Sequence, residues 1–155
     1  MEPGTNPANY DFDHPSSLDF EAVFQSLKDL REMKVTKIPV YSFITNAKVP
    51  GEFKEIKPKH FVIFEGIMAF YDERIRDLLD LKIFIHCDSD ISLCRRVMRD
   101  IQDRGRDATE VLTRYNKFVR EDYNNFVKPC MKYADIVLPG GANNSSKLKP
   151  YLSWF

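Results

Sequence analysis

The sequence predicts an α/β protein with a parallel sheet and helices packed against it. Three short, continuous apolar runs, at residues 61–64, 83–85 and 136–138, have the length and character of strands buried on both faces. Segments with apolar residues at helical spacing separate these runs, so strand and helix alternate along the chain. Such alternation is typical of parallel sheets, whose ligands bind beyond the carboxyl ends of the strands.

Composition fits a single globular domain. The 155 residues, 43% of them hydrophobic, are enough to build one core. Lys+Arg and Asp+Glu each number 23, and the resulting net charge of +0 disfavours diffuse binding to nucleic acid. The 3 cysteines form no C-x-x-C pair, which favours a reducing, cytoplasmic location. No apolar run approaches the ~20 residues of a membrane span, so we expect no membrane partner.

The N-terminal residues predict a leader followed by a helix. Residues 1–9 are rich in Pro, Gly and Asn and indicate a disordered leader. Ser16 and Asp19 form a capping-box pattern at the start of the helix. Apolar residues then recur at three- and four-residue steps, which predicts a helix to about Met33.

A hairpin is predicted next. Pro39 and the alternation in residues 40–44 indicate an edge strand, and residues 48–58 are its expected partner at the rim of the sheet. Tyr41 and Phe43 fall on one face of this strand. They are suited either to stacking on a base or to ordinary packing.

The remaining helices are predicted at residues 72–79, 89–102 and 108–132. In the second of these, five apolar residues form the stripe expected to face the core: Ile91, Cys94, Val97, Met98 and Ile101. Residues 145–155 form a tail whose packing the sequence does not indicate.

Arginines are concentrated in residues 95–107, at the end of the helix predicted at 89–102 and in the loop after it. They are Arg95, Arg96, Arg99, Arg104 and Arg106. Arg96 and Arg99 share a helix face, and Gly105 allows the chain to bend so that the arginines beside it fold back over the same ligand. The pattern indicates a phosphate clamp and lid, the alternative being a solvated helix face with local aspartate partners.

Other candidate residues are carboxylates. Asp13 is suited to sugar hydroxyls, although a negative charge before a helix is also favourable by itself. Glu65 follows the apolar run at 61–64, where a buried carboxylate needs a cation or ligand, and this favours a place near Mg²⁺. We propose no zinc site at residues 86–88, because adjacent strand residues face opposite ways.

From about residue 9 to residue 144 the chain resembles the uridine/cytidine kinases, P-loop-type nucleoside kinases of the phosphoribulokinase/uridine kinase type. The motifs that carry the resemblance are Phe12-Asp13-His14-Pro15, Pro39-Val40-Tyr41-Ser42-Phe43, Phe64-Glu65-Gly66-Ile67, Arg95-Arg96-Val97-Met98-Arg99-Asp100, Arg104-Gly105-Arg106-Asp107 and Lys132-Tyr133-Ala134-Asp135-Ile136-Val137. The resemblance implies a kinase-like domain over residues 10–144. It also implies ATP-dependent, Mg²⁺-dependent phosphorylation of the 5′-hydroxyl of uridine or cytidine, in pyrimidine salvage, by a cytosolic oligomer.

The resemblance implies a role for each matching residue. It implies that the nucleoside is bound by Asp13, Tyr41, Phe43, Arg96 and Arg106. It implies that Arg99 and Arg104 contact the phosphates and that Glu65 helps to organise the magnesium shell.

Three positions depart from the family pattern. Asn46 stands where the family has a base-reading His, and Arg114 stands where it has a Gln, so both belong to the expected nucleoside site. Asn143 falls in the segment expected beside the adenine of ATP, where an Arg and a carboxylate of the family pattern are replaced. The changes at Asn46 and Arg114 are expected to weaken or alter the choice of pyrimidine.

The resemblance also implies that some parts are missing. No G-x-x-x-x-G-K-[ST] phosphate loop occurs in these 155 residues, and the family's catalytic Asp also precedes Asn9. We therefore expect no complete catalytic set, and unpaired strand edges that make an isolated monomer poorly stable or sticky.

Three hypotheses follow. The first is a truncated nucleoside kinase homologue, inactive as given. The second is a non-catalytic protein that assembles with an intact family member. An RNA-binding module is the weakest of the three.

Overall fold

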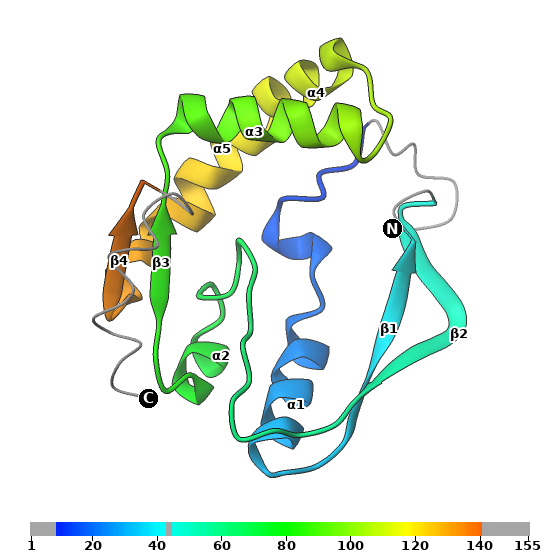
Figure 1. Cartoon of the computed structure of the whole chain (residues 1–155), viewed down its shortest axis with the longest axis vertical. Helices are drawn as coiled ribbons and strands as arrows, with labels where there is room; N and C mark the ends of the chain where they lie inside the picture. Colours follow the sequence, from blue (N-terminus) through cyan, green and yellow to red (C-terminus); the bar gives the residue numbers. More distant parts are fainter. Residues whose placement is uncertain (1–8, 43–44, 141–155) are drawn as a thin grey trace. The chain divides into compact units, whose positions relative to one another are not determined.

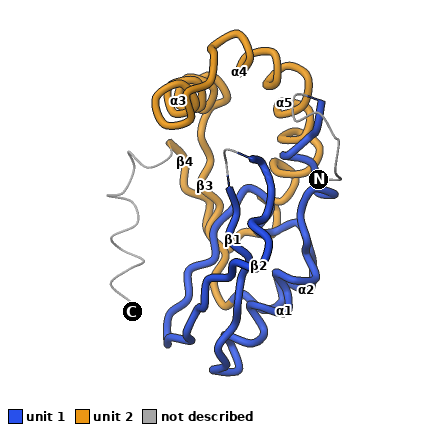
Figure 2. Tube along the Cα trace, turned by 90° about the vertical axis from the view of Figure 1, so that its right-hand side faces the viewer, with its two compact units in different colours: residues 1–79 blue, residues 80–155 orange. Residues whose placement is uncertain are grey.

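The computed structural model describes residues 9–42 and 45–140 of the chain (Figure 1). The chain divides into two compact units, Met1–Leu79 and Asp80–Phe155, called here the N-terminal and C-terminal units (Figure 2). The expected leader, for residues 1–8, and the expected tail at 145–155 lie outside the described residues.

The N-terminal unit contains the predicted hairpin. Strand β1 (Thr36–Ser42) pairs antiparallel with β2 (Ala47–Ile56). The register shifts between Pro39 and Tyr41, where proline has no N–H to donate to the ladder. The hairpin forms a two-stranded sheet of its own and does not pair with the parallel sheet within the described residues, so its expected place at the rim of that sheet stays a prediction.

Helix α1 (Phe20–Arg31) begins later than the sequence predicts. The Asp19 side chain caps it by accepting a hydrogen bond from the Ala22 N–H at 3.1 Å, so the predicted cap at Ser16 is wrong. Ser16 instead belongs to a short 3₁₀ turn, Pro15–Ser17, because proline fixes the backbone at the start of that turn. Beyond the helix, Met33 has a left-handed φ of 59°.

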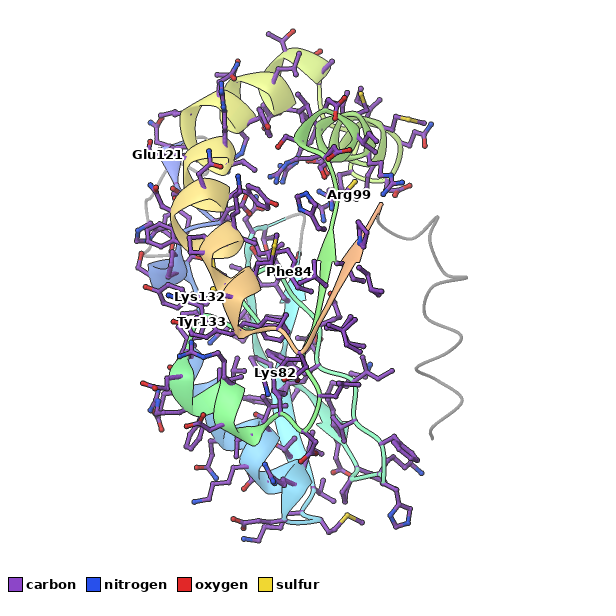
Figure 3. All side chains as sticks on the ribbon, turned by 90° about the vertical axis from the view of Figure 1, so that its left-hand side faces the viewer. Lys82, Phe84, Arg99, Glu121, Lys132 and Tyr133 are labelled. Atoms are coloured by element: carbon purple, nitrogen blue, oxygen red, sulfur yellow. The ribbon has the colours of Figure 1, made fainter. Side chains whose placement is uncertain are left out.

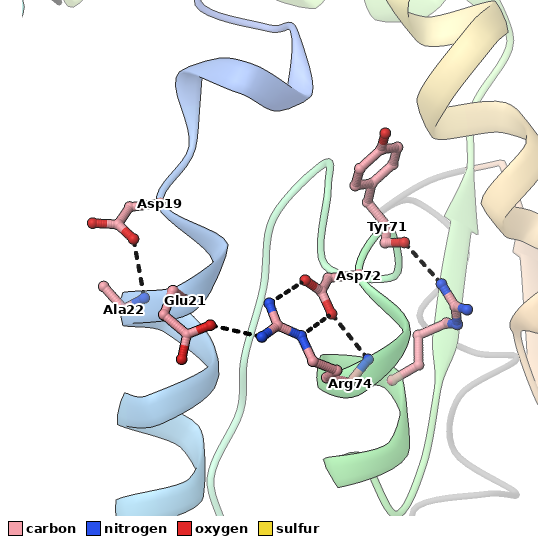
Figure 4. Close-up of polar contacts among 7 residues, drawn as sticks. Asp19, Glu21, Ala22, Tyr71, Asp72 and Arg74 are labelled. Carbon is pink, nitrogen blue, oxygen red and sulfur yellow. Dashed lines mark hydrogen bonds and ion pairs between the residues drawn. The ribbon is translucent and has the colours of Figure 1, made fainter.

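Helix α2 (Glu73–Leu78) confirms the helix predicted at 72–79, with Asp72 as its N-cap. Arg74 links it to α1, since its guanidinium contacts Glu21 at 2.6 Å and Asp72 at 2.8 Å (Figure 4). Ile75, on the same helix, is 0% exposed. The charged contacts of Arg74 therefore join the two helices at the surface, and α2 also has a fully enclosed apolar position.

The Asp72–Arg74 contact makes the stability of this unit depend on pH. The hydrogen bond from the Arg74 side chain lowers the pKa of Asp72 below its ordinary value of 3.8. The carboxylate therefore stabilises the folded state above that pH, and this contribution is lost as the pH falls through the lowered pKa.

We accordingly expect Asp72→Asn, which keeps a capping side chain, to lower the free energy of unfolding at pH 7. The difference from the parent chain should shrink below about pH 4. Urea denaturation between pH 3 and pH 7 measures it, with Asp77→Asn on the exposed face of α2 as the control. A difference that is constant with pH would contradict the expectation.

The strand predicted at residues 61–64 is absent. The structure assigns no strand there among the described residues, and Phe61, Val62 and Ile63 are 72%, 48% and 92% exposed. A continuous apolar run is buried only where a sheet partner and covering helices enclose it. No described strand pairs with this run, so its apolar side chains face outward.

The C-terminal unit contains the predicted parallel pairing. Strand β3 (Ile83–His86) pairs with β4 (Ile136–Pro139), with Ile83 opposite Ile136. Phe84 and Leu138 are buried, but Ile85 and Val137 are 59% and 42% exposed. The expectation of burial on both faces is therefore wrong for these two strands, because the described helices do not cover both faces.

Helices flank this sheet in the C-terminal unit. Helix α3 (Ser89–Gln102) has the predicted bounds, and a continuous helical stretch then confirms the helix predicted at 108–132. Its parts are α4 (Ala108–Arg114), a π-helical turn (Tyr115–Val119), α5 (Arg120–Asp122), a second π-helical turn (Tyr123–Val127) and a 3₁₀ end (Lys128–Tyr133). Figure 3 shows Phe84 lying between β3 and the last part of this stretch. The predicted α/β class, with a parallel sheet and flanking helices, is confirmed.

The apolar stripe predicted for α3 does not form its buried face. Ile91, Met98 and Ile101 are 43%, 59% and 42% exposed, whereas Asp100 is 1% exposed. The position of α3 that is enclosed is thus a charged one, and ion pairs make this possible.

Along residues 9–42 and 45–140, none of the helices is long and apolar enough to cross a membrane.

Candidate functional site

Four arginines gather around the buried carboxylate of Asp100 in the C-terminal unit. Asp100 Oδ1 lies 2.8 Å from Arg99 Nη2 and 3.2 Å from Arg104 Nη1. Asp100 Oδ2 lies 3.9 Å from both Arg96 Nε and Arg106 Nη1. These five residues are called the arginine cluster, and they confirm that the arginines on both sides of Gly105 come together.

The backbone at the end of α3 makes this gathering possible. The helix presents Arg96, Arg99 and Asp100, and the chain then turns through Gly105, whose φ is 61°. The Arg106 N–H donates a hydrogen bond to the Asp100 carbonyl at 3.0 Å, which brings the loop back to the helix. The predicted bend at Gly105 is confirmed, since a left-handed φ strains most other residues.

The cluster has more positive than negative charge. Four guanidinium groups face one carboxylate, and the five side chains lie within one helix end and one loop. Burial lowers the pKa of Arg104, and the charges of Arg99, Arg106 and Arg96 act in the same direction, whereas Asp100 opposes them. An anionic group bound here would relieve this repulsion, and planar guanidinium groups suit phosphate oxygens.

The loop after the cluster leads directly into α4. The Asp107 carboxylate caps that helix by accepting from the N–H groups of Thr109 and Glu110. The hydrogen bonds from Glu110 and Thr109 lower the pKa of Asp107. The Asp107 carboxylate therefore binds the first N–H groups of α4, and this contact helps to fix the loop that precedes the helix.

Arg114 lies at the last position of α4, half-buried. Its guanidinium carbon lies 6.0 Å from the centre of the Phe118 ring, a cation–π contact.

The other predicted nucleoside residues belong to the N-terminal unit. Asp13 lies in a turn in which its N–H donates to Asp11 Oδ1 at 3.1 Å. Tyr41 on β1 is 41% exposed, and Asn46 occupies the hairpin turn with a φ of 52°. Phe43 lies outside the described residues.

Glu65 is exposed and follows the irregular segment at 61–64, so its expected place at the end of a buried strand is wrong. Burial therefore does not require a cation beside it. Among the residues that the structure describes, no three or more His, Cys, Asp or Glu side chains group as metal ligands would. Asn143, expected near the adenine, lies outside the described residues.

Sequence reasoning treated Asp100 only as a local partner of the arginines and missed its central place. A signal was available, because Asp100 lies four residues after Arg96 within the helix predicted at 89–102. On a helix, that spacing brings opposite charges together on one face.

The parallel sheet, its flanking helices and the separate hairpin define an α/β protein with a P-loop kinase-like fold. A family model described as Phosphoribulokinase / Uridine kinase family matches residues 2–146. The chain belongs to this family, which confirms the resemblance of its motifs.

Curated relatives agree with this assignment. Uridine-cytidine kinase-like 1 of Mus musculus is 43% identical over 137 residues, which are 88% of this chain and 25% of that protein. Uridine-cytidine kinase 2-B of Danio rerio is 43% identical over 135 residues, 87% of this chain and 51% of its own length. Uridine kinase of Schizosaccharomyces pombe is 43% identical over 136 residues, 88% of this chain and 30% of its own length. The chain thus spans between a quarter and about half of these relatives.

Proposed function

We propose that this chain provides the substrate-clamping part of a uridine/cytidine kinase homologue. The reaction is transfer of the γ-phosphate of ATP, with Mg²⁺, to the 5′-hydroxyl of a pyrimidine ribonucleoside, in cytoplasmic pyrimidine salvage. Support comes from the family assignment and from relatives named as uridine or uridine-cytidine kinases. The 155 residues alone are expected to be inactive.

The arginine cluster is the observation on which this proposal depends. Arg99 and Arg104 share one oxygen of Asp100, and they are the pair proposed to contact phosphates. Arg96 and Arg106 face the other oxygen and are proposed to act toward the nucleoside. Arg99 is 46% exposed at its side chain, so it retains donors that a ligand can reach.

The remaining proposed roles come from the family pattern. In the N-terminal unit they are Asp13 for ribose hydroxyls and Tyr41, Phe43 and Asn46 for the base. Arg114 is proposed for the nucleoside, Asn143 for ATP and Glu65 for the magnesium shell.

Replacement of one cluster arginine tests the clamp. We expect Arg104→Ala to weaken binding of inorganic triphosphate roughly 10- to 100-fold, because it removes a charge-assisted contact of about 1.5–3 kcal/mol. Isothermal titration calorimetry measures the affinity. Arg95→Ala is the matched control, since it removes the same charge from the same unit, on α3, where Arg95 contacts Cys87 Sγ at 3.7 Å and not Asp100.

Equal weakening in both variants would show a diffuse charge effect and contradict a specific clamp. A parent chain that binds UMP no better than AMP would contradict the pyrimidine assignment while leaving the clamp in place.

A second function is favoured by the exposed apolar run at residues 61–63. According to this second function, the chain has no catalytic role and assembles with an intact family member or with a second copy of itself. Exposed contiguous apolar side chains are typical of interaction surfaces, and Ile63 is 92% exposed.

Co-expression with an intact family member tests this function. We expect the two chains to elute together, and Ile63→Lys to separate them, because a charge at the contact is costly to desolvate. Leu18→Lys is the control, since Leu18 is 45% exposed in the same unit but outside the run. Separate elution of the parent chain would exclude the second function.

A further inference from the structure

The two oxygens of the Asp100 carboxylate divide the four arginines into two pairs. Oδ1 is close to Arg99, at 2.8 Å, and to Arg104, at 3.2 Å. Oδ2 lies 3.9 Å from both Arg96 and Arg106, and it has no hydrogen-bond partner in the part of the chain that the structure describes. The division matches the two roles proposed above, phosphate for the first pair and nucleoside for the second.

Asp100 is held more firmly than the arginines around it. Its side chain is 1% exposed, whereas those of Arg96, Arg99, Arg104 and Arg106 are 23%, 46%, 29% and 21% exposed. The Asp100 backbone is fixed by α3 and by the hydrogen bond from the Arg106 N–H. A fixed anion thus lies at the centre of four long, flexible cations.

Such an arrangement orders the arginines before a ligand arrives. A free arginine side chain loses rotamer freedom when it binds, which costs affinity. Asp100 restricts that freedom in the unbound protein. Because each guanidinium has five N–H donors, a contact to one carboxylate oxygen leaves others for an anion.

We infer that Asp100 is a positioning residue that organises the phosphate clamp without contacting the ligand. This inference rests on the proposed function, in which the arginine cluster binds phosphate groups. It assigns to Asp100 a role beyond helix stability, since a carboxylate among arginines lowers the net positive charge and yet improves anion binding.

The direction in which one substitution changes the affinity for an anion distinguishes a positioning role from simple electrostatics. Asp100→Asn removes a negative charge from the centre of the cluster, so Coulomb attraction alone predicts tighter binding of an anion. Positioning predicts weaker binding, because the guanidinium groups lose the anion that orders them. Opposite signs make the result decisive.

The experiment titrates inorganic triphosphate into the full 155-residue chain and its variants at one fixed salt concentration, by calorimetry. We expect Asp100→Asn to bind roughly 10- to 100-fold more weakly, the loss typical of misplaced binding groups. Asp103→Asn removes the same charge from an exposed position three residues further on, and we expect it to bind at least as tightly as the parent chain. Titrations are made well below each variant's melting temperature, so lower stability alone leaves the affinity unchanged.

Each other outcome overturns the inference. If Asp100→Asn binds as tightly as the parent chain or more tightly, while Arg104→Ala binds more weakly, the clamp stands and the positioning role fails. If the parent chain does not bind triphosphate, both the proposed clamp and the positioning role fail. If circular dichroism shows that Asp100→Asn is unfolded, Asp100→Glu replaces it. That variant keeps the charge but moves it by one methylene, and an unchanged affinity would then exclude positioning.

Discussion

The purified 155-residue chain, incubated with ATP, Mg²⁺ and uridine, is expected to form no UMP above background. These residues contain no G-x-x-x-x-G-K-[ST] loop to cradle the phosphates of ATP. Loss of a general base alone typically lowers the rate by about 10²–10⁴-fold. Loss of the phosphate cradle adds to this, because phosphoryl transfer depends almost entirely on positioning and charge stabilisation.

Chromatographic detection of UMP from labelled uridine is the measurement, with an intact family member as the positive control. UMP formation by the pure chain that disappears in Arg104→Ala would contradict the expectation, because it would show a complete catalytic site within these residues. UMP formation that persists in that variant would indicate a contaminating kinase.

The largest expected effect on stability comes from the core of the N-terminal unit. Ile75 is 0% exposed on α2, so Ile75→Ala removes fully buried methyl groups and leaves a cavity. We expect it to lower the free energy of unfolding by about 2–5 kcal/mol. Urea denaturation followed by circular dichroism measures the loss.

Ile63→Ala is the matched control, because it makes the same substitution in the same unit at a side chain that is 92% exposed. We expect a change within about 0.5 kcal/mol. Comparable destabilisation by both variants would show that Ile63 is buried in solution, as in an oligomer, and a repeat of the experiment at several protein concentrations would reveal this.

The two results together bear on the two proposed functions. An inactive chain whose residues 61–63 remain exposed would leave the proposed clamp and the proposed assembly surface as the functions still to be tested. All five residues of the arginine cluster, the proposed clamp, belong to the C-terminal unit. The binding properties of the cluster are therefore testable whatever contacts the N-terminal unit makes.

Several local features were predictable from the sequence for a physical reason. Helix α3 has the predicted bounds, and the hairpin and the parallel pairing of β3 with β4 occur where they were expected. Helical periodicity, turn residues and short apolar runs act over a few residues, so the chain itself contains the information. The bend at Gly105 belongs to this group.

Burial was predicted less well, because it depends on which segments pack together. The run at residues 61–64 is as apolar as a central strand, yet it is exposed where no described strand pairs with it. The α3 stripe was expected to face the core, whereas the enclosed position is Asp100. A sequence pattern identifies an apolar face but does not identify what covers it.

By itself the sequence determined most of the helices, the hairpin, the family and the arginine-rich segment, because local spacing and ordered motifs specify these features. Only the tertiary structure decided that four arginines meet at the two oxygens of Asp100. The reason is geometric. Arg106 comes back to α3 through the left-handed turn at Gly105 and one backbone hydrogen bond, and the position of a carboxylate relative to four flexible side chains is fixed only when that loop closes.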